Sequence, residues 1–205
     1  MAMTDVPKVV IRRLPLYVRH LEHLIEQGER VISSAGMGRL IGVTPAQIRK
    51  DLSYFGEFGR QGLGYDLVYL RSQLLHILQA DKQWHLALIG AGALGHALVH
   101  YREFREHLYH IVAAFDVDSA KVGSQIGDLT IQGMDDLADT VADLGVEIGI
   151  LAVPSDAAQQ AADDLVASGI KAILNYAPIG LSVPDGVRVA HIDPLASLQT
   201  LSYYL

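Results

Sequence analysis

The chain has 205 residues, of which half are hydrophobic, and it carries a formal net charge of −7 at pH 7. It contains no cysteine, which excludes a disulfide framework, a thiolate metal site and a cysteine nucleophile. No apolar run approaches the ~20 residues of a membrane span, and residues 1–13 lack the apolar core of a signal peptide. We therefore expect a cytoplasmic protein with neither a membrane nor a metal partner.

The charge is divided unevenly along the chain. Residues 1–80 contain ten Lys or Arg against seven Asp or Glu, a net +3, whereas residues 81–205 contain six against sixteen, a net −10. This asymmetry indicates that only the first segment meets a polyanion. A polar joint over residues 81–83 separates the segments. We expect three parts: a DNA-binding domain (1–80), a nucleotide-binding domain (81–192) and a C-terminal dimerisation helix (193–205).

The first segment opens with helical patterns. Apolar side chains over residues 7–27 recur near the 3.6-residue period, which predicts an amphipathic helix ended by Gly28. A second, short helix is expected to start from a cap at Ser33 or Ser34 and to end at Ile41.

A third helix opens at Thr44 with a full set of N-terminal signals. Thr44 suits the N-cap, Pro45 the first helical position, and Gln47 the closing position of a capping box. Its exposed face would carry Ala46, Arg49, Lys50 and Ser53. A helix, a tight turn and a capped basic helix predict a helix-turn-helix whose last helix enters the major groove of DNA. A solvated basic face on a small helical domain is the alternative.

The segment after this helix is rich in glycine. Residues 56–64 hold four glycines, interleaved with aromatic and apolar side chains. This pattern predicts a small β-hairpin with Arg60 near its tip, which after a recognition helix forms the wing of a winged helix and places an arginine against phosphate or the minor groove. A flexible linker is the alternative, although linkers seldom carry alternating aromatic residues.

The second segment begins with a nucleotide-binding pattern. The apolar run over residues 86–89 predicts a strand covered on both faces of a parallel sheet. Gly90, Gly92 and Gly95 follow as G-x-G-x-x-G, which permits a tight turn, close approach of a pyrophosphate and close packing of the next helix. The phosphates would lie on N–H groups at the positive end of that helix. The loop residues expected to contact the cofactor are Gly90, Ala91, Gly92, Ala93, Leu94 and Gly95.

A second apolar run, over residues 111–115, ends at Asp116, 21 residues after Gly95. A carboxylate at this position would accept hydrogen bonds from the adenosine ribose hydroxyls and repel a 2′-phosphate. The pattern therefore predicts NAD(H) rather than NADP(H). A bare α/β turn with a solvated aspartate is the alternative.

Strand and helix patterns continue to alternate after Asp116. We expect an acidic helix over residues 134–144, strands over 148–153 and 172–174, and between these strands a helix capped by Ser155 or Asp156 and ending near Gly169. A loop over residues 176–179 would lie at the C-terminal end of the last strand. This order predicts an α/β fold, a winged-helix domain followed by a Rossmann-type, doubly wound parallel sheet.

The C-terminal segment, residues 193–205, predicts a helix with an apolar stripe. The stripe is formed by Leu195, Leu198, Leu201 and Leu205, with Tyr203 and Tyr204 nearby. Such a helix either caps its own domain or docks against a partner subunit.

Residues 47–65, Gln-Ile-Arg-Lys-Asp-Leu-Ser-Tyr-Phe-Gly-Glu-Phe-Gly-Arg-Gln-Gly-Leu-Gly-Tyr, closely resemble the signature of the Rex family of redox-sensing bacterial transcriptional repressors. Four later segments resemble the same family: Phe-Asp-Val-Asp (115–118), Lys-Val-Gly (121–123), Asn-Tyr-Ala-Pro (175–178) and the tail over 198–205. The resemblance covers essentially the whole chain. It implies a homodimer with exchanged C-terminal helices that binds palindromic operator DNA and releases it when NADH binds.

The resemblance also implies sets of site residues. The expected DNA contacts are Thr44, Gln47, Arg49, Lys50, Ser53, Tyr54 and Arg60. Many members carry a basic residue where Gln61 stands, which leaves Arg60 as the expected wing contact. Beside the glycine loop, the expected NADH or NAD⁺ site contains Tyr101, Asp116 and Lys121. Because an apolar pocket penalises the positive ring of NAD⁺ by desolvation, we expect the nicotinamide against Val153, Pro154, Tyr176, Ala177, Pro178 and the partner's terminal helix. The resemblance also implies an allosteric switch formed by Arg19, Tyr101 and Asp193. In this switch Asp193 pairs with one of the other two residues in one state and exchanges it in the other state.

Two other classes of function stay open. A small NAD-dependent oxidoreductase with a helical dimerisation arm would need a substrate domain and a proton-transfer group. No stretch of chain remains for a substrate domain, and the histidines that could serve are His96, His100, His107, His110 and His191. The other class is a nucleotide-binding adaptor that contacts protein rather than DNA.

Overall fold

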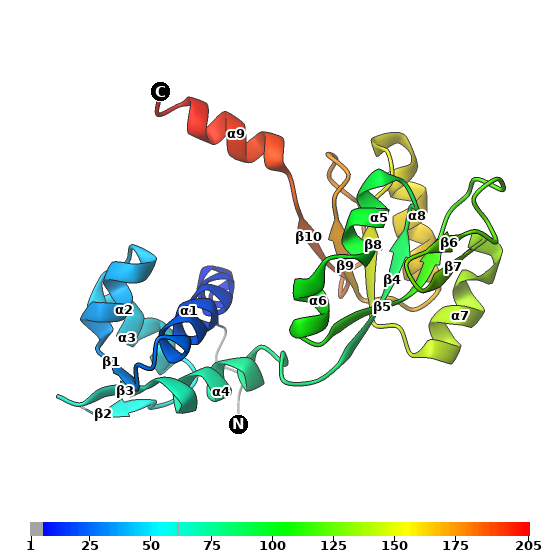
Figure 1. Cartoon of the computed structure of the whole chain (residues 1–205). Helices are drawn as coiled ribbons and strands as arrows, with labels where there is room; N and C mark the ends of the chain where they lie inside the picture. The colour runs from blue at the N-terminus through cyan, green and yellow to red at the C-terminus, as the bar shows by residue number, and fades with distance from the viewer. Residues whose placement is uncertain (1–5, 61) are drawn as a thin grey trace. The chain divides into compact units, whose positions relative to one another are not determined.

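The computed structural model describes residues 6–60 and 62–205, and the chain divides into two compact units, Met1–Lys82 and Gln83–Leu205 (Figure 1). Among the described helices, none combines the length and apolar character needed to cross a membrane.

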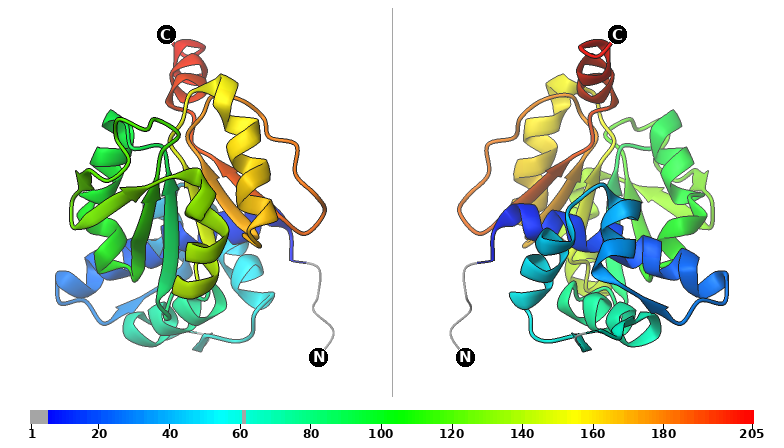
Figure 2. Two further views of the ribbon diagram at one scale, coloured as in Figure 1. Left: turned by 90° about the vertical axis from the view of Figure 1, so that its right-hand side faces the viewer. Right: turned by 90° about the vertical axis from the view of Figure 1, so that its left-hand side faces the viewer.

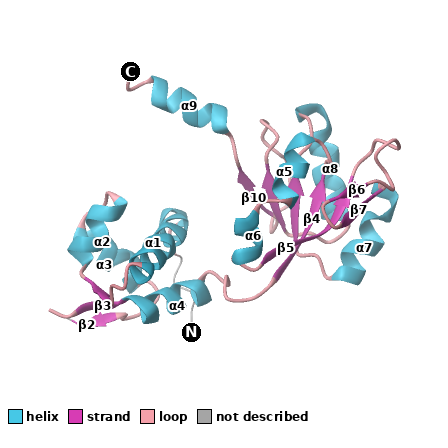
Figure 3. Ribbon diagram, in the orientation of Figure 1, coloured by secondary structure: helices cyan, strands magenta, loops and turns pink. Residues whose placement is uncertain are grey.

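The described part of the first unit, residues 6–60 and 62–82, contains four helices and a small sheet. The helices are α1 (Lys8–Glu26), α2 (Ser34–Ile41), α3 (Pro45–Ser53) and α4 (Leu67–Ile77). The strands are β1 (Val31–Ile32), β2 (Gly59–Arg60) and β3 (Gly64–Asp66), in the antiparallel order β1-β3-β2 (Figure 3). The helix-turn-helix and the hairpin after it are confirmed as elements, whereas β1 was not predicted. The hairpin β2–β3 is called the wing below.

Local signals explain why this unit folds as it does. Ser33 Oγ accepts from Gly36 N at the start of α2, and Asp66 Oδ1 accepts from Tyr69 N at the start of α4. The core joins the inner faces of all four helices and includes Leu14, Met37, Ile48, Leu52, Leu70 and Leu74. In the wing, a side chain at Gly59 would lie within 3 Å of the Tyr65 ring, so the two strands approach closely only because this residue is glycine.

The second unit is built on a seven-stranded sheet. Its strands are β4 (Trp84–Ile89), β5 (Tyr109–Phe115), β6 (Gln125–Ile126), β7 (Leu129–Gln132), β8 (Ile148–Leu151), β9 (Ala172–Asn175) and β10 (Arg188–His191). Its helices are α5 (Ala93–Val99), α6 (Arg102–Glu106), a 3₁₀ turn (Met134–Asp136), α7 (Leu137–Leu144), α8 (Ser155–Ala167) and α9 (Pro194–Ser202). The strand order is β10-β9-β8-β4-β5-β7-β6, and every pairing is parallel except that of β6 with β7.

This order confirms the doubly wound sheet. The chain runs outward from β4 in one direction through β5 and β7, then returns to the other side of β4 with β8, so the topology switches between β4 and β8. Helices α7 and α8 pack on one face of the sheet and α5 on the other, which gives two apolar cores (Figure 2). Ligands of such sheets bind beyond the carboxyl ends of the strands at this switch point.

Four details differ from the sequence expectations. The strand β10 and the β6–β7 hairpin were not predicted. The expected cap of α8 is wrong: Ser155 is already helical, and Pro154, which has no capping side chain, occupies the N-cap. The expected capping box of α3 is half right, because Thr44 Oγ1 accepts from Gln47 N at 3.2 Å while the Gln47 amide turns away to donate to Asp51.

The C-terminal helix α9 extends from the end of β10 away from the sheet (Figure 1). Asp193 caps it by accepting from Ala196 N at 3.0 Å. Every residue from 191 to 205 is exposed, including Leu195, Leu198 and Leu201 at 60% each. The helix therefore presents its apolar stripe to the surroundings rather than to its own sheet.

Candidate functional site

The glycine loop after β4 shows a different constraint at each glycine. Gly90 has φ +102°, and a Cβ atom there would lie 2.5 Å from the carbonyl oxygen of Ala152. A Cβ at Gly95 would collide with the carbonyl oxygen of Gly90. A Cβ at Gly92 would meet nothing within 4 Å. The turn and the packing of α5 thus require Gly90 and Gly95, whereas Gly92 keeps space open above the loop, as a nearby pyrophosphate would need.

Asp116 joins this loop to the end of β5. It is only 7% exposed, and its Oδ2 accepts from Ala91 N and from Lys121 Nζ, both at 2.9 Å. Its Oδ1 accepts from Asp118 N at 2.9 Å. Burial opposes ionisation, but the hydrogen bonds from Lys121 and the two backbone amides outweigh it, so the pKa of Asp116 lies below its ordinary value. The carboxylate stays charged, and Oδ1 retains a lone pair for a ribose hydroxyl.

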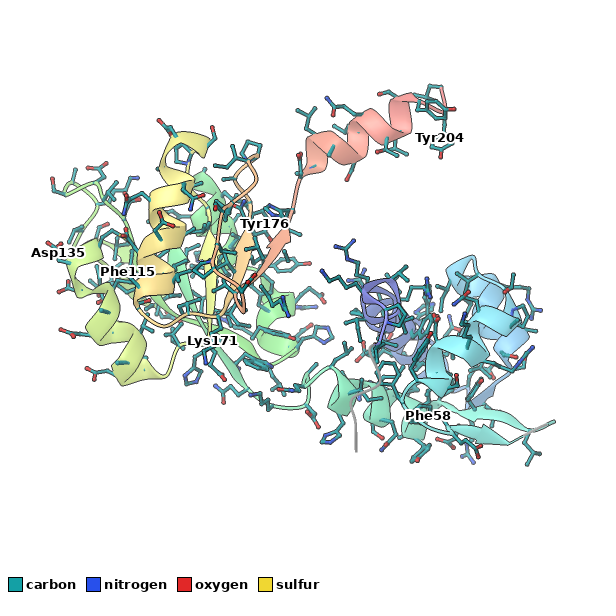
Figure 4. The ribbon with its side chains drawn as sticks, turned by 180° about the vertical axis from the view of Figure 1, so that it is seen from behind. Phe58, Phe115, Asp135, Lys171, Tyr176 and Tyr204 are labelled. Atoms are coloured by element: carbon teal, nitrogen blue, oxygen red, sulfur yellow. The ribbon has the colours of Figure 1, made fainter. Side chains whose placement is uncertain are left out.

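The segments that follow β8 and β9 lie next to the glycine loop, on the side away from Asp116. A Cβ at Gly90 would lie 2.9 Å from Val153 Cγ1, so the segment after β8 abuts the glycine turn. Tyr176 N, just after β9, donates to Leu151 O at 3.0 Å, which ties the next loop to β8. Ala177 is buried and Tyr176 half-buried (labelled in Figure 4). With the exposed Pro154, these residues gather beyond the carboxyl ends of β8 and β9, where the sequence predicts the apolar side of the nicotinamide site.

Tyr101 lies close to this apolar side. Burial raises the pKa of Tyr176, and the Tyr101 hydroxyl raises it further. Tyr101 is half exposed and its ring stacks edge-on against Phe104, with 5.1 Å between ring centroids. It also lines an open cavity of about 470 Å³, whose other apolar walls include Leu98, Phe104 and Ile111.

The recognition helix α3 presents its basic residues outward. Ile48 and Leu52 are buried, while Arg49, Lys50 and Ser53 are exposed. Arg49 Nη1 donates to Ser34 Oγ of α2 at 3.0 Å. Burial raises the pKa of Tyr65 in the wing, and the positive charge of Arg49 opposes that rise. The guanidinium of Arg49 is therefore placed where α2, α3 and the wing converge.

Two other expected DNA contacts, Thr44 and Ser53, make hydrogen bonds inside the unit. The Thr44 hydroxyl accepts from Gln47 N, and the Ser53 hydroxyl donates to Lys50 O at 2.8 Å. Tyr54 is the half-buried C-cap of α3. The backbone of Arg60 falls in β2, but its side chain, like the whole of Gln61, lies outside what the structure describes.

Sequence reasoning missed a buried acidic residue on the inner side of α3. Asp51 is fully buried, and its carboxylate accepts from Arg13 Nε at 2.6 Å, Arg13 Nη2 at 2.7 Å, Gln47 Nε2 at 2.6 Å and the Tyr17 hydroxyl. Burial opposes its ionisation, but these four donors outweigh burial and lower the pKa of Asp51. The spacing of Asp51 from Ile48, three positions apart on the apolar face, was the available signal. This network ties the recognition helix to α1.

The three residues of the expected switch fall in different units. Arg19 is exposed on α1 in the first unit, whereas Tyr101 and Asp193 belong to the second. Asp193 serves as the N-cap of α9. Their mutual pairing stays a prediction. Among residues 6–60 and 62–205, no group of three or more His, Asp or Glu side chains is arranged to hold a metal ion.

Family models match both units. A model described as a putative DNA-binding protein N-terminus matches residues 5–53, and a CoA binding domain model matches residues 81–179. A protein named redox-sensing transcriptional repressor Rex from Chloroflexus aurantiacus is 52% identical over 97% of this chain and 94% of its own length. A protein of the same name from Listeria welshimeri is 46% identical over 98% of this chain and 94% of its own.

Solved structures give the same result. The crystal structure of RSP in complex with β-NAD⁺ and operator DNA has a TM-score of 0.93 and 42% identity, covering 98% of this chain and 93% of that one. The structure of RSP with β-NADH has a TM-score of 0.89 and 40% identity, covering 98% and 94%. This chain therefore belongs to the Rex family of redox-sensing transcriptional repressors and not to the NAD-dependent oxidoreductases.

Proposed function

We propose that this chain represses transcription as a cytoplasmic homodimer that binds palindromic operator DNA when NADH is scarce and releases it when NADH binds. The observation that carries the proposal is the presence in one chain of a winged-helix unit with an outward basic helix and a glycine-loop unit in which a buried, charged carboxylate, Asp116, contacts the loop. The likeness to RSP, solved with β-NAD⁺ and operator DNA and with β-NADH, supports the pairing of these two ligands.

In this proposal the dinucleotide lies across the switch point of the sheet. The pyrophosphate faces Gly92 and the first turn of α5, and Asp116 accepts the ribose hydroxyls while Lys121 stays beside it. The nicotinamide lies against Val153, Pro154, Tyr176 and Ala177, near Tyr101. The oxidised ring carries a positive charge that this apolar lining leaves poorly solvated, whereas the reduced ring is neutral. The site therefore favours NADH.

The proposed DNA contacts are the polar and basic side chains of α3 and the wing. Arg49 and Lys50 are proposed to reach the major groove, and Arg60 to contact the duplex from the wing. Thr44, Gln47, Ser53 and Tyr54 are proposed to lie along the same surface, at the two ends of α3, and to donate hydrogen bonds to phosphate oxygens.

Arg49→Ala is expected to weaken operator binding by about 1–3 kcal/mol, because a bidentate arginine contact to guanine contributes that much. The measurement is anisotropy of the operator duplex from the RSP complex, compared with a shuffled duplex of equal length, over a range of salt concentrations. The control is Arg102→Ala, which removes the same charge from an exposed position of α6. Wild-type affinity and salt dependence in Arg49→Ala would remove α3 from the DNA interface.

The exposed stripe of α9 supports the homodimer. A helix of nine residues is marginal by itself, so its apolar residues need a partner surface. A second copy supplies one at the cavity beside Tyr101, and exchange between two identical chains closes a twofold dimer. The proposed switch needs such a dimer, because in it Asp193 pairs with Tyr101 in one state and with Arg19 in the other.

Leu198→Asp is expected to dissociate this dimer, since burial of one leucine contributes about 1.5–3 kcal/mol and a buried unpaired carboxylate adds a further penalty. Sedimentation equilibrium measures the change in the dimer dissociation constant. The matched control is Gln199→Asp, which places the same charge one position off the stripe. Equal dimer dissociation constants for the two variants would exclude α9 from the dimer interface.

A further inference from the structure

Asn175, the last residue of β9, has a side chain that contacts two parts of the second unit. It is fully buried. Toward the following loop, its Oδ1 accepts from Ala177 N at 2.9 Å, and its Nδ2 donates to Ala177 O at 3.1 Å and to Ile179 O at 3.0 Å. Toward the neighbouring strand, the same Nδ2 lies 3.2 Å from Nδ1 of His191.

The first set of contacts fixes the shape of the loop over residues 176–179. One carboxamide binds both the N–H and the C=O of Ala177, and it also holds the C=O of Ile179, so the backbone turns around the Asn175 side chain. Tyr176 and Ala177 belong to this loop and form part of the proposed nicotinamide lining. A nicotinamide ring that displaces this loop therefore changes the hydrogen bonds between Asn175 and the loop backbone.

The second contact reaches the segment from which α9 departs. His191 is the last residue of β10 and pairs in register with Asn175, and Ile192 N donates to Asn175 O at 2.9 Å. Asp193, the N-cap of α9, follows directly. Asn175 therefore contacts both the loop over residues 176–179 and the segment from which α9 begins.

The carboxamide nitrogen cannot serve all three acceptors equally. It carries two hydrogens, whereas Ala177 O, Ile179 O and His191 Nδ1 all lie within 3.2 Å. His191 Nδ1 accepts when the ring proton is on Nε2. If the carbonyl of Ala177 or Ile179 moves, the hydrogen bond from Asn175 Nδ2 to His191 Nδ1 becomes stronger or weaker. The loop and the base of α9 therefore compete for the same two N–H groups of Asn175.

We propose that Asn175 and His191 are positioning residues that transmit occupancy of the nicotinamide loop to the base of α9, and so to the partner subunit. This inference rests on the proposed function, because it needs NADH in the site and α9 at a dimer interface. It adds a route inside one protomer to the switch residues Tyr101, Asp193 and Arg19.

The test separates coupling from binding. Operator affinity is measured without NADH and with saturating NADH, and the ratio of the two dissociation constants is the coupling factor. NADH affinity is measured separately by titration calorimetry. In His191→Leu, which keeps the volume but removes the acceptor, the coupling factor is expected to fall about 2- to 30-fold, the range found for residues along a coupling network. The NADH and NADH-free operator affinities should stay within about twofold of wild type.

Two further variants keep the test sharp. His191→Asn restores a side-chain acceptor and is expected to recover coupling, whereas Arg188→Ala, at the exposed start of the same strand, should leave it unchanged. Full coupling in His191→Leu would overturn the inference, and so would loss of NADH binding, because the residue would then support the site itself. A wild-type coupling factor of one is a different outcome, since it removes the proposed function and this inference with it.

Discussion

Asp51→Ala is expected to destabilise the first unit by roughly 3–5 kcal/mol while the second unit stays folded. Removing one partner of a buried ion pair leaves the other charge uncompensated, and losses of this size are typical. Here the change leaves Arg13, Tyr17 and Gln47 without their shared acceptor. Because the network ties α3 to α1, the variant should also lose operator binding and retain NADH binding.

Two probes distinguish the units in a urea titration. Trp84, the single tryptophan of the chain, lies in β4 of the second unit, so its fluorescence reports that unit, and far-UV circular dichroism reports the helices of both. Glu57→Ala removes an exposed carboxylate between α3 and the wing and should change stability by less than about 0.5 kcal/mol. An Asp51→Ala curve that overlays wild type would show that the network does not hold the unit together.

The same carboxylate gives the first unit a defined pH dependence. The pKa of Asp51 is lower in the folded than in the unfolded chain, so its contribution is present above the unfolded value of about 3.9 and is lost as pH falls through the folded value. Wild type should lose stability below about pH 4, and Asp51→Asn should lose less over that interval because it has no carboxylate to protonate.

Asp116→Asn is expected to reduce the preference for NADH over NADPH by about 10-fold or more, because a hydrogen bond to a charged group contributes about 1.5–3 kcal/mol. In the proposed site this carboxylate accepts from the ribose hydroxyls of NADH and repels the 2′-phosphate of NADPH. The asparagine oxygen still accepts from Ala91 N, so the glycine loop should keep its shape.

Titration of both dinucleotides against wild type and variant measures this ratio. Asp118→Asn is the matched control, since Asp118 lies two residues away with a half-exposed side chain. An unchanged ratio in Asp116→Asn would remove Asp116 from the ribose site, and a changed ratio in Asp118→Asn alone would assign the ribose carboxylate to that residue instead.

Strong local signals explain which elements could be predicted. Thr44 and Pro45 set the start of α3, and the spacing of Gly90, Gly92 and Gly95 after an apolar run located the central strand and the glycine turn. The missed strand β10 has three exposed residues out of four and lacks an apolar run, and it pairs only with β9, at the edge of the sheet. No periodic pattern marks such an edge strand.

Buried polar residues were the other gap. Asp51 meets Arg13 and Tyr17, which lie 38 and 34 positions away, so its role depends on contacts that no local pattern encodes. The same network explains why only half of the capping box forms. The Gln47 side chain donates to Asp51 and so does not turn back to the backbone of Thr44. Asn175 similarly appears in sequence only as part of a loop motif, and its contact with His191 arises from the register of β9 and β10.

Reciprocal titration tests the proposed repressor most directly. If NADH and operator DNA exclude each other, saturating operator duplex must weaken NADH binding by the same factor by which NADH weakens operator binding. Calorimetric titration of NADH, with and without the operator duplex from the RSP complex, gives that factor for wild type, Tyr101→Phe and Asp193→Ala. We predict equal factors from the two directions in wild type and smaller factors in both variants, with each ligand still bound. NADH affinity that is identical with and without operator DNA would contradict the proposal.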